Sequence, residues 1–179
     1  MVRNDIEHLQ KMGAKFKTVS IPSLRHVLYV ALVTAFSEAS AVHEHNLKTQ
    51  YENFGQDVRL LLLLGQLPSA VDYIKAQQIR RQLLNEFNEA FNSVDVLISP
   101  TLPFLPPDIG HYEIELNGRL VNYLDDAPRL TFPGNITGLP CLSIPCGFIN
   151  GMPVGMQIIG KAFSEGTVLK VGYAYEKST

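Results

Sequence analysis

The chain has 179 residues, of which 46% are hydrophobic and 18% charged, and its formal net charge at pH 7 is −2. A chain of this length and composition is expected to form one compact unit with its own apolar core, which excludes a disordered tail and a pair of ordinary enzyme domains. The small negative charge argues against nucleic-acid binding, and the two cysteines, Cys141 and Cys146, are too few and too close together for a disulfide framework.

Membrane insertion and secretion are not indicated by the sequence. The most apolar stretch, Val27 to Phe36, is ten residues long, about half of the ~20 residues that a membrane-spanning helix needs. The first residues, MVRNDIEHLQ, lack the apolar centre of a signal peptide. We therefore expect a cytoplasmic protein that makes no membrane contact.

The first part of the chain combines helical and strand patterns. Apolar residues at helical spacing precede Gly13, a residue type that often ends a helix. The stretch Phe16 to Ile21 has an alternating character that predicts a short strand. Ser23 is then a candidate N-cap for a helix that runs to about His43, because alanines and larger apolar residues recur there every three or four positions.

Two further helices are predicted before residue 95. The first, Asp57 to Leu64, contains five consecutive leucines, Leu60–Leu64, which cover the whole circumference of a helix. Such a run indicates either burial on more than one side or an exposed patch that takes a partner, and the sequence leaves both interpretations open. The second helix begins at Pro68–Ser69, where Ser69 and Asp72 have the spacing of a capping box.

Beyond Val94 the pattern changes to short apolar runs bounded by turn residues. The predicted strands are Val96–Ile98, a hairpin over Glu113–Val121 with Asn117–Gly118 at its turn, Leu142–Pro145 and Val154–Ile159. Ser164 is predicted to cap a final helix. The expected fold class is α/β, with a mixed β-sheet flanked by helices in a single unit over residues 1–179.

Local catalytic motifs are absent from the sequence. No serine lies in a G-x-S-x-G or S-x-x-K motif, and His43 and His45 are two positions apart on a helix, so we expect no metal site. Cys146 is either a nucleophile or, by the better interpretation, a buried small apolar residue. The adjacent carboxylates Asp125 and Asp126 suit either the binding of an ammonium or amide group or a solvated turn.

Three segments together resemble one protein family, the amidase-signature enzymes, in their amino-acid sequences, order and spacing. The segments are Val94–Thr101 (VDVLISPT), Thr131–Gly147 (TFPGNITGLPCLSIPCG) and Met152–Gly160 (MPVGMQIIG). The resemblance is to the C-terminal part of these amide hydrolases and extends over nearly the whole chain. It therefore implies a partial amidase-signature fold.

The resemblance also implies where the chemistry lies. Family members cleave amides with a nucleophilic serine, which is activated through a second serine in a cis peptide and a lysine. These residues belong to a Gly- and Ser-rich region that is N-terminal to anything present here. We therefore expect no catalytic residue, no metal and no cofactor in this chain, and no activity from the chain alone.

Two substrate-binding residues follow from the same resemblance. In glutamine-using members, an arginine on a helix and an aspartate on a loop hold the amino-acid ends of the substrate. The matching positions here are Arg80, which by itself could equally be a solvated helix residue, and Asp126. The distance from Asp126 to Pro133 is longer than in those members, so a different amide substrate is as credible as glutamine.

The expected partners follow from this interpretation. The missing N-terminal half of the parent enzyme is the first, a small amide is the substrate of the parent, and self-association is expected because uncovered sheet edges tend to pair. One alternative is a non-catalytic interaction module that retains the scaffold and binds a partner, or itself, through Leu60–Leu64. A third hypothesis is an independent enzyme that uses Cys146 or Asp126 in unrelated chemistry.

Overall fold

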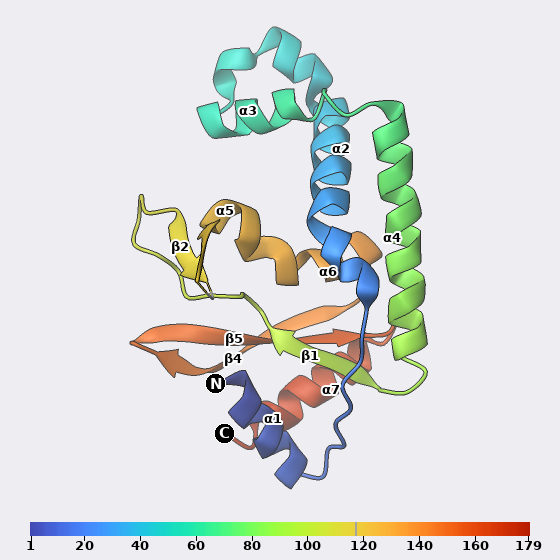
Figure 1. Cartoon of the computed structure of the whole chain (residues 1–179), viewed down its shortest axis with the longest axis vertical. Helices are drawn as coiled ribbons and strands as arrows, with labels where there is room; N and C mark the ends of the chain where they lie inside the picture. The colour runs from blue at the N-terminus through green and yellow to red at the C-terminus, as the bar shows by residue number, and fades with distance from the viewer. Residues whose placement is uncertain (117) are drawn as a thin grey trace.

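The structure is a computed structural model that describes residues 1–116 and 118–179. Its helices are α1 (Val2–Lys11), η1 (Pro22–His26), α2 (Val27–Thr49), η2 (Tyr51–Asn53), α3 (Gln56–Leu64), α4 (Ala70–Ala90), α5 (Tyr123–Asp126), η3 (Ala127–Leu130), α6 (Phe132–Thr137) and α7 (Glu165–Glu176). Its strands are β1 (Val96–Pro100), β2 (Glu113–Leu116), β3 (Arg119–Asn122), β4 (Cys141–Ile149) and β5 (Met152–Gly160). The sheet formed by β1, β5 and β4 lies between α1 and α7 below and the remaining helices above (Figure 1).

All strand pairs in the described part of the chain are antiparallel. The main sheet has the order β1-β5-β4, and β2 and β3 form a separate hairpin. Asn150 and Gly151 join β4 to β5, and their positive φ angles of 51° and 78° suit the tight two-residue turn that antiparallel neighbours need. The predicted α/β class with helices flanking a sheet is confirmed, although the pairs seen are antiparallel rather than mixed.

The two faces of the sheet belong to two apolar clusters. On the upper face, Leu97 and Ile159 pack with residues of α2, α4 and α6. On the lower face, Ile98 and Met156 pack with α1 and α7. The strands alternate their side chains between these faces, so a single apolar strand such as β1 contributes to both clusters.

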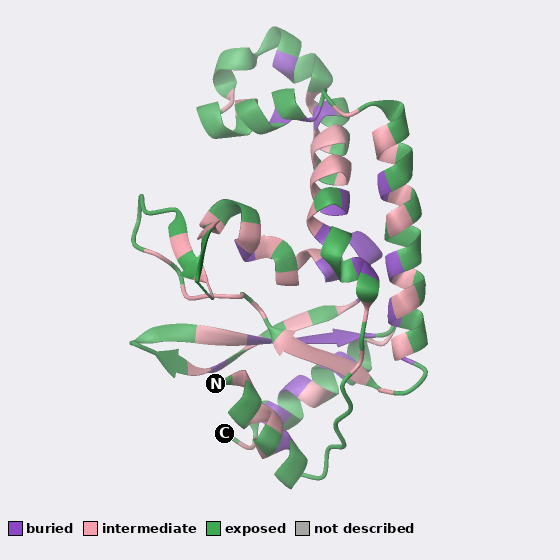
Figure 2. Cartoon of the chain, viewed as in Figure 1, coloured by how far each residue is buried: buried purple, intermediate pink, exposed green. Residues whose placement is uncertain are grey.

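A long helical pair, α2 and α4, rises from the upper cluster. Leu83 and Phe87 of α4 are almost completely buried, and Val30 of α2 is fully buried. Figure 2 shows burial concentrated where the two helices approach the sheet, whereas α3, at their far end, is mostly exposed. The Ser40 hydroxyl holds α3 against α2 by donating a hydrogen bond to the Leu62 carbonyl oxygen over 2.6 Å.

Capping of the helices agrees with the sequence in one case and differs in another. Ser69 and Asp72 form the predicted capping box at the start of α4, with hydrogen bonds in both directions. Ser23 does not cap a helix: it lies inside η1, and both its backbone amide and its hydroxyl donate to the Glu86 carboxylate, over 2.8 and 2.6 Å. The predicted helix therefore begins later, at Val27, and continues to Thr49.

The strand predicted over Phe16–Ile21 is wrong for this chain. The segment follows Gly13, whose φ of +99° ends α1 as expected, but residues 14–21 contain no strand. A strand is stabilised by backbone hydrogen bonds to a neighbour, and no described strand lies beside this segment. The hairpin predicted over Glu113–Val121 is confirmed by the pairing of β2 with β3, while Asn117 lies outside the described residues.

Candidate functional site

Arg80 lies on α4 and connects three helices. Its Nε donates a hydrogen bond to the Ile136 carbonyl oxygen of α6, and its Nη1 donates to Gln77 Oε1 over 3.1 Å. Gln77 in turn donates from Nε2 to the Thr34 hydroxyl of α2 over 3.0 Å. Because the Ile136 carbonyl is close to the C-terminus of α6, a guanidinium is a favourable partner there. Arg80 is thus held in place by two hydrogen bonds, although the residue itself is exposed.

The hollow beside Arg80 has a volume of about 280 Å³. It lies between α4 and α6 and is bordered by Gln77, Leu84 and Thr137. A guanidinium with one fixed edge at such a hollow has the planar geometry that suits a carboxylate or an amide oxygen.

Asp126 is the last residue of α5 and faces a different partner. Its Oδ1 accepts a hydrogen bond from Arg129 Nη1 over 3.3 Å, and the side chain of Arg129 is 46% exposed. An exposed pair of this kind contributes about 0 to 1 kcal/mol. Among the described residues, no hydrogen bond or ion pair joins Asp126 to Arg80, so the structure does not bring the two predicted substrate-binding side chains into direct contact.

A row of polar side chains crosses the upper face of the sheet, and the sequence analysis missed it. Ser99 of β1 and Ser143 of β4 both pair in register with Gln157 of β5. Gln157 is 3% exposed, and its Nε2 donates to the Ser99 hydroxyl over 3.3 Å and to the Leu130 carbonyl oxygen over 2.9 Å. The sequence signal for this row is that each of the three otherwise apolar strands contains one polar residue, and that these three residues pair with one another across the sheet.

This polar row leads to the Ser-Pro-Thr loop that follows β1. The hydroxyls of Thr101 and Ser143 are 2.6 Å apart and hydrogen-bonded. They border an open hollow of about 780 Å³, whose other walls are the loop from Leu102 to Pro106 and the first residues of α1. The hollow is lined mainly by apolar side chains with a few polar groups, which is the general composition of small-molecule sites.

One serine and one histidine are hydrogen-bonded, and such a pair is a candidate for a serine nucleophile with a histidine as its base. His8 Nε2 lies 2.9 Å from the Ser178 hydroxyl oxygen. That hydroxyl donates its own proton to the Tyr175 carbonyl oxygen over 2.7 Å. In this arrangement the imidazole donates to the serine and cannot remove its proton, so the pair lacks the geometry of an activated nucleophile.

Cys146 is also unsuited to nucleophilic chemistry in this arrangement. Burial, together with the nearby negative charge of Asp5, raises the pKa of its thiol to about 11. The nucleophilic form is the thiolate, which is scarce at neutral pH when the pKa is raised. The geometry therefore favours the interpretation of Cys146 as a buried apolar residue.

Two kinds of feature were not found in the part of the chain that the structure describes. Over residues 1–116 and 118–179, no three His, Cys, Asp or Glu side chains are grouped so that they could hold a metal ion. The ring of His43 instead packs edge-on against Phe54, with the ring centres 5.7 Å apart. No helix in these two ranges has the length and apolar character needed to cross a bilayer.

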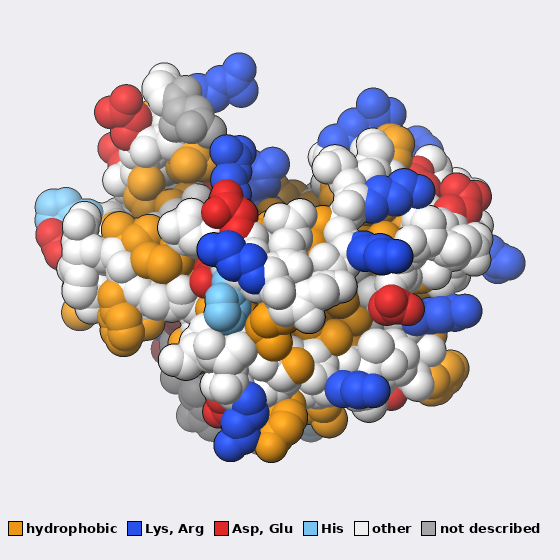
Figure 3. Space-filling view, turned by 90° about the horizontal axis from the view of Figure 1, so that it is seen from below, with side chains coloured by type: hydrophobic (Ala, Val, Ile, Leu, Met, Phe, Trp, Pro, Cys, Tyr) orange, Lys and Arg blue, Asp and Glu red, His pale blue; other side chains and the backbone are white. Residues whose placement is uncertain are grey.

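The underside of the molecule has no single-sign charged field. Figure 3 views the molecule from below and shows basic side chains scattered over this surface with acidic and hydrophobic ones between them. Because acidic, hydrophobic and uncharged polar groups separate the basic side chains, this face differs from the continuous basic patch that binds nucleic acids.

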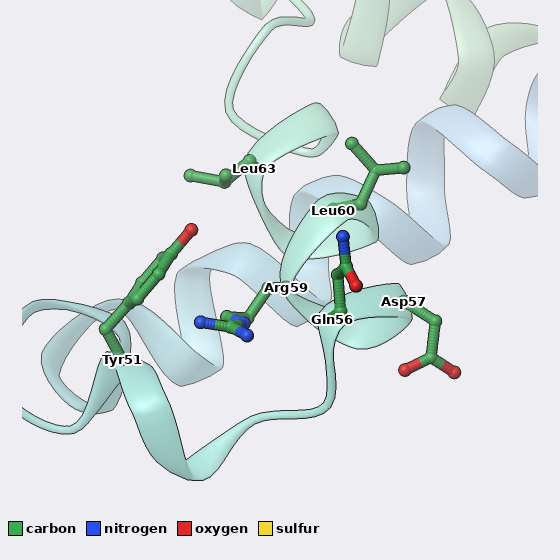
Figure 4. A pocket seen from close by; sticks show the side chains of 6 residues that line it. All are labelled: Tyr51, Gln56, Asp57, Arg59, Leu60 and Leu63. Carbon is green, nitrogen blue, oxygen red and sulfur yellow. The ribbon is translucent and has the colours of Figure 1, made fainter.

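A third hollow lies at α3, far from the sheet. Figure 4 shows Tyr51 and Arg59 facing each other there, with Asp57 pointing away and Leu60 and Leu63 along the rim. The Arg59 guanidinium lies 4.8 Å from the centre of the Tyr51 ring, which is a cation–π contact. Of the five consecutive leucines only Leu62 is buried, so the run forms an exposed apolar patch.

Comparisons with known proteins agree on one family. The family model described as Amidase matches residues 1–169. The glutamyl-tRNA(Gln) amidotransferase A subunits from Synechococcus sp. (strain JA-2-3B'a(2-13)) and Symbiobacterium thermophilum are 37% and 34% identical to the chain. In both comparisons 99% of this chain is covered, but only 38% and 40% of the relative.

Solved structures give the same result. A crystal structure of an amidase superposes with a TM-score of 0.89 at 32% identity and covers 99% of this chain and 41% of its own. The glutamyl-tRNA(Gln) amidotransferase A subunit from Thermotoga maritima superposes with a TM-score of 0.72 at 32% identity and covers 98% of this chain and 37% of its own. The chain thus spans about two fifths of the length of the proteins it matches.

Proposed function

The chain belongs to the amidase family, and from this membership we propose that it forms the C-terminal scaffold and part of the substrate pocket of an amidase-signature hydrolase. In this proposal the complete enzyme hydrolyses a carboxamide with a Ser-Ser-Lys arrangement. Those three residues lie on polypeptide outside this chain.

One observation carries the proposal, namely the unequal coverage of this chain and its relatives. Nearly all of the chain matches, whereas only 38% of the Synechococcus relative and 41% of the solved amidase are matched in return. The hydrogen-bonded pair of His8 and Ser178 also lacks the geometry of an activated nucleophile, since the Ser178 hydroxyl donates to a carbonyl oxygen. A scaffold without its own reactive groups fits both facts.

Within this proposal Arg80 and Asp126 remain the substrate-binding residues. Nε and Nη1 of Arg80 are held by Ile136 and Gln77, whereas Nη2 has no hydrogen-bond partner among the residues that the structure describes. Nη2 is therefore the atom that would bind a substrate carboxylate or carbonyl oxygen. Asp126 would bind an ammonium group only after releasing Arg129, which is a weak, exposed pair.

The test is an assay with and without complementing polypeptide. The chain alone is expected to show no hydrolysis of glutamine or simple amides. Co-expression with the part of the Synechococcus relative that the chain does not match is expected to restore turnover, and Arg80→Met is expected to raise KM while Lys75→Met, an exposed cation on the same helix, does not. Turnover by the isolated chain, or no turnover in the reconstituted pair, contradicts the proposal.

The alternative of a non-catalytic interaction module is favoured by one observation. Leu60, Leu61, Leu63 and Leu64 of α3 are between 39% and 58% exposed, and contiguous apolar patches of this kind often mark binding surfaces. Size-exclusion chromatography and apolar-dye binding distinguish the two functions. A concentration-dependent increase in mass, together with an inactive reconstituted pair, supports the module.

A further inference from the structure

Gln77 lies one turn before Arg80 on α4 and contacts it through its side-chain amide. Gln77 Oε1 accepts the hydrogen bond from Arg80 Nη1 over 3.1 Å, and Gln77 Nε2 donates to the Thr34 hydroxyl of α2 over 3.0 Å. Gln77 is half-buried, whereas Arg80 is exposed. The amide of Gln77 therefore connects the guanidinium of an exposed side chain to a second helix, which fixes the position of one edge of that guanidinium.

The chemistry of the three groups allows the Gln77 amide only one orientation. A guanidinium has donors and no acceptor, so the atom that contacts it must be an oxygen. The amide nitrogen of Gln77 is left to face Thr34, whose hydroxyl oxygen can accept a hydrogen bond. Thr34 thus holds the amide in the orientation that Arg80 requires.

Both groups that hold Arg80 are electrically neutral. Nη1 donates to the Gln77 amide, and Nε donates to the Ile136 carbonyl oxygen. Over residues 1–116 and 118–179, no carboxylate forms an ion pair with Arg80. A carboxylate would hold a guanidinium and also cancel its charge, whereas these neutral acceptors hold it and leave its charge uncompensated.

The hollow beside Arg80 has the same electrostatic character. Of the described residues that line this hollow of about 280 Å³, Arg80 and Arg81 are cationic and none is acidic. A cationic hollow without a competing negative group favours an anionic ligand.

We propose that Gln77 is a positioning residue, which together with Thr34 holds the Arg80 guanidinium and leaves its positive charge and its Nη2 free for a substrate carboxylate. The inference rests on the proposed function, in which Arg80 binds the substrate. The expected substrate is then an amide that carries a carboxylate. A guanidinium that is already held binds such a group more tightly, because less side-chain entropy is lost on binding.

The first measurement uses the chain alone and does not depend on activity. NMR relaxation gives the order parameter of the Arg80 Nε–H bond, which is expected to exceed about 0.6 in the unaltered chain. Gln77→Leu is expected to lower it below about 0.6, and Thr34→Val to lower it by a smaller amount. Gln78→Leu, which replaces an exposed glutamine at the next position, is the matched control and should leave it unchanged. An unchanged order parameter in Gln77→Leu overturns the inference.

The second measurement uses the chain co-expressed with the unmatched part of the Synechococcus relative. Gln77→Leu is expected to raise KM for glutamine by about fivefold or more at unchanged kcat, because the lost contact affects binding and not the chemical step. Gln78→Leu should change neither constant. In an Arg80→Met background Gln77→Leu should cause no further rise, since Gln77 acts through Arg80. A further rise of equal size gives Gln77 a separate role and overturns the inference.

Gln77→Glu separates the position of Arg80 from its charge. The new carboxylate still accepts from Nη1, and the Thr34 hydroxyl can donate to it, so the order parameter of Arg80 should remain high. Its negative charge cancels that of Arg80, so KM for glutamine should rise by about fivefold or more, whereas KM for butyramide, a neutral amide, should not change. An unchanged KM for glutamine contradicts the role of the uncompensated charge. This variant and Thr34→Val decide if Gln77→Leu fails to fold.

The outcomes distinguish the inference from the proposed function. A reconstituted pair that hydrolyses butyramide but not glutamine overturns the inference and leaves the hydrolase function standing, and the same holds if Arg80→Met does not raise KM for glutamine. An inactive pair contradicts the proposed function. The order parameters of Arg80 in the chain alone then decide whether Gln77 holds the guanidinium.

Discussion

The side-chain amide of Gln157 donates a hydrogen bond to the main-chain carbonyl oxygen of Leu130 over 2.9 Å. Gln157 is in the centre of the sheet, and Leu130 ends η3, the turn that follows Asp126. The buried side chain of Gln157 therefore holds η3, the turn that follows Asp126, at a fixed distance from the sheet. The shape of this part of the proposed pocket depends on a residue of β5 that no bound molecule needs to touch.

We expect Gln157→Leu to destabilise the chain by about 1 to 3 kcal/mol, because the Leu130 carbonyl loses its donor while it remains covered. Chemical denaturation of the variant and the unaltered chain measures this difference. Gln78→Leu on the exposed face of α4 is the matched control, with an expected change within about 0.5 kcal/mol. Equal effects of the two substitutions would mean that the hydrogen bond to Leu130 contributes little.

Much of the fold was predictable because local signals agreed with the tertiary structure. The capping box at Ser69 and the leucine run of α3 both fall in the expected helices. The strand predicted at Phe16–Ile21 is absent because an alternating pattern alone is not sufficient for a strand. A strand also needs a neighbouring strand for its backbone hydrogen bonds, and the described chain provides none at this segment. Ser23 does not cap a helix because its hydroxyl donates to the carboxylate of Glu86. Glu86 lies 63 positions away in the sequence, so local spacing does not reveal this contact.

The candidate site was less predictable than the fold. Arg80 and Asp126 came from a resemblance, and nothing in their spacing indicated that Arg80 would be anchored to the Ile136 carbonyl. The polar row at Gln157 depends on the register of three strands that lie far apart in the sequence. Register is a tertiary property, so the individual serines and the glutamine gave no sign of a common location.

Glu86 is expected to make stability depend on acid pH. Burial acts to raise the pKa of Glu86, but the hydrogen bonds from Ser23 and Gln82 outweigh it and hold that pKa below its ordinary value of 4.5. A lowered folded-state pKa stabilises the fold above pH 4.5, and this contribution is lost as the pH falls below that value. Glu86→Gln should lower the unfolding free energy at neutral pH by about 1 kcal/mol or more and flatten its acid dependence.

The control for Glu86 is Glu89→Gln, because Glu89 is one turn further along α4 and exposed. Unfolding curves recorded from neutral pH down to pH 3 compare both variants with the unaltered chain. A Glu86→Gln variant that retains the full acid dependence would show that other carboxylates cause it.

Limited trypsin digestion should cut first between α1 and η1. Lys15 and Lys17 are exposed, and no backbone hydrogen bond involves residues 15–20 of this described segment. Proteases need extended, accessible backbone, which helices do not provide without local unfolding. Mass spectrometry of the earliest fragments identifies the site, and replacing both lysines by glutamine should delay cleavage. First cuts at Arg80 or Arg81 within α4 would contradict the expectation.

Self-association, if it occurs, should depend on the outer leucines of α3 and not on the inner one. Leu60→Lys combined with Leu63→Lys should abolish any concentration-dependent increase in mass measured by light scattering, with little change in stability. Leu62 is 3% exposed, and Leu62→Ala should lower the unfolding free energy by about 2 to 5 kcal/mol. Association that persists in the double lysine variant would assign it to another surface.

Alkaline pH should weaken the contact between α1 and α7. Burial, together with the hydrogen bond that its hydroxyl donates to Asp5 Oδ1 over 2.9 Å, raises the pKa of Tyr175 to about 12 from its ordinary 10.0. Burial and the charge of Asp5 likewise raise the pKa of Cys146 from 9.0 to about 11. The folded state holds both protons more tightly than the unfolded state, so this stabilisation is complete below pH 9 and is lost as the pH rises towards 12.

Tyr175→Phe tests this contact because it removes one titrating group and leaves the partly buried Asp5 carboxylate without its donor. The variant should have a lower unfolding free energy at neutral pH, by about 1 to 3 kcal/mol, and a shallower decline at alkaline pH. Tyr173→Phe on the same helix is the matched control, because Tyr173 is 60% exposed. If Tyr175→Phe and the unaltered chain lose stability in parallel above pH 9, the contact between Tyr175 and Asp5 is not responsible for the alkaline decline.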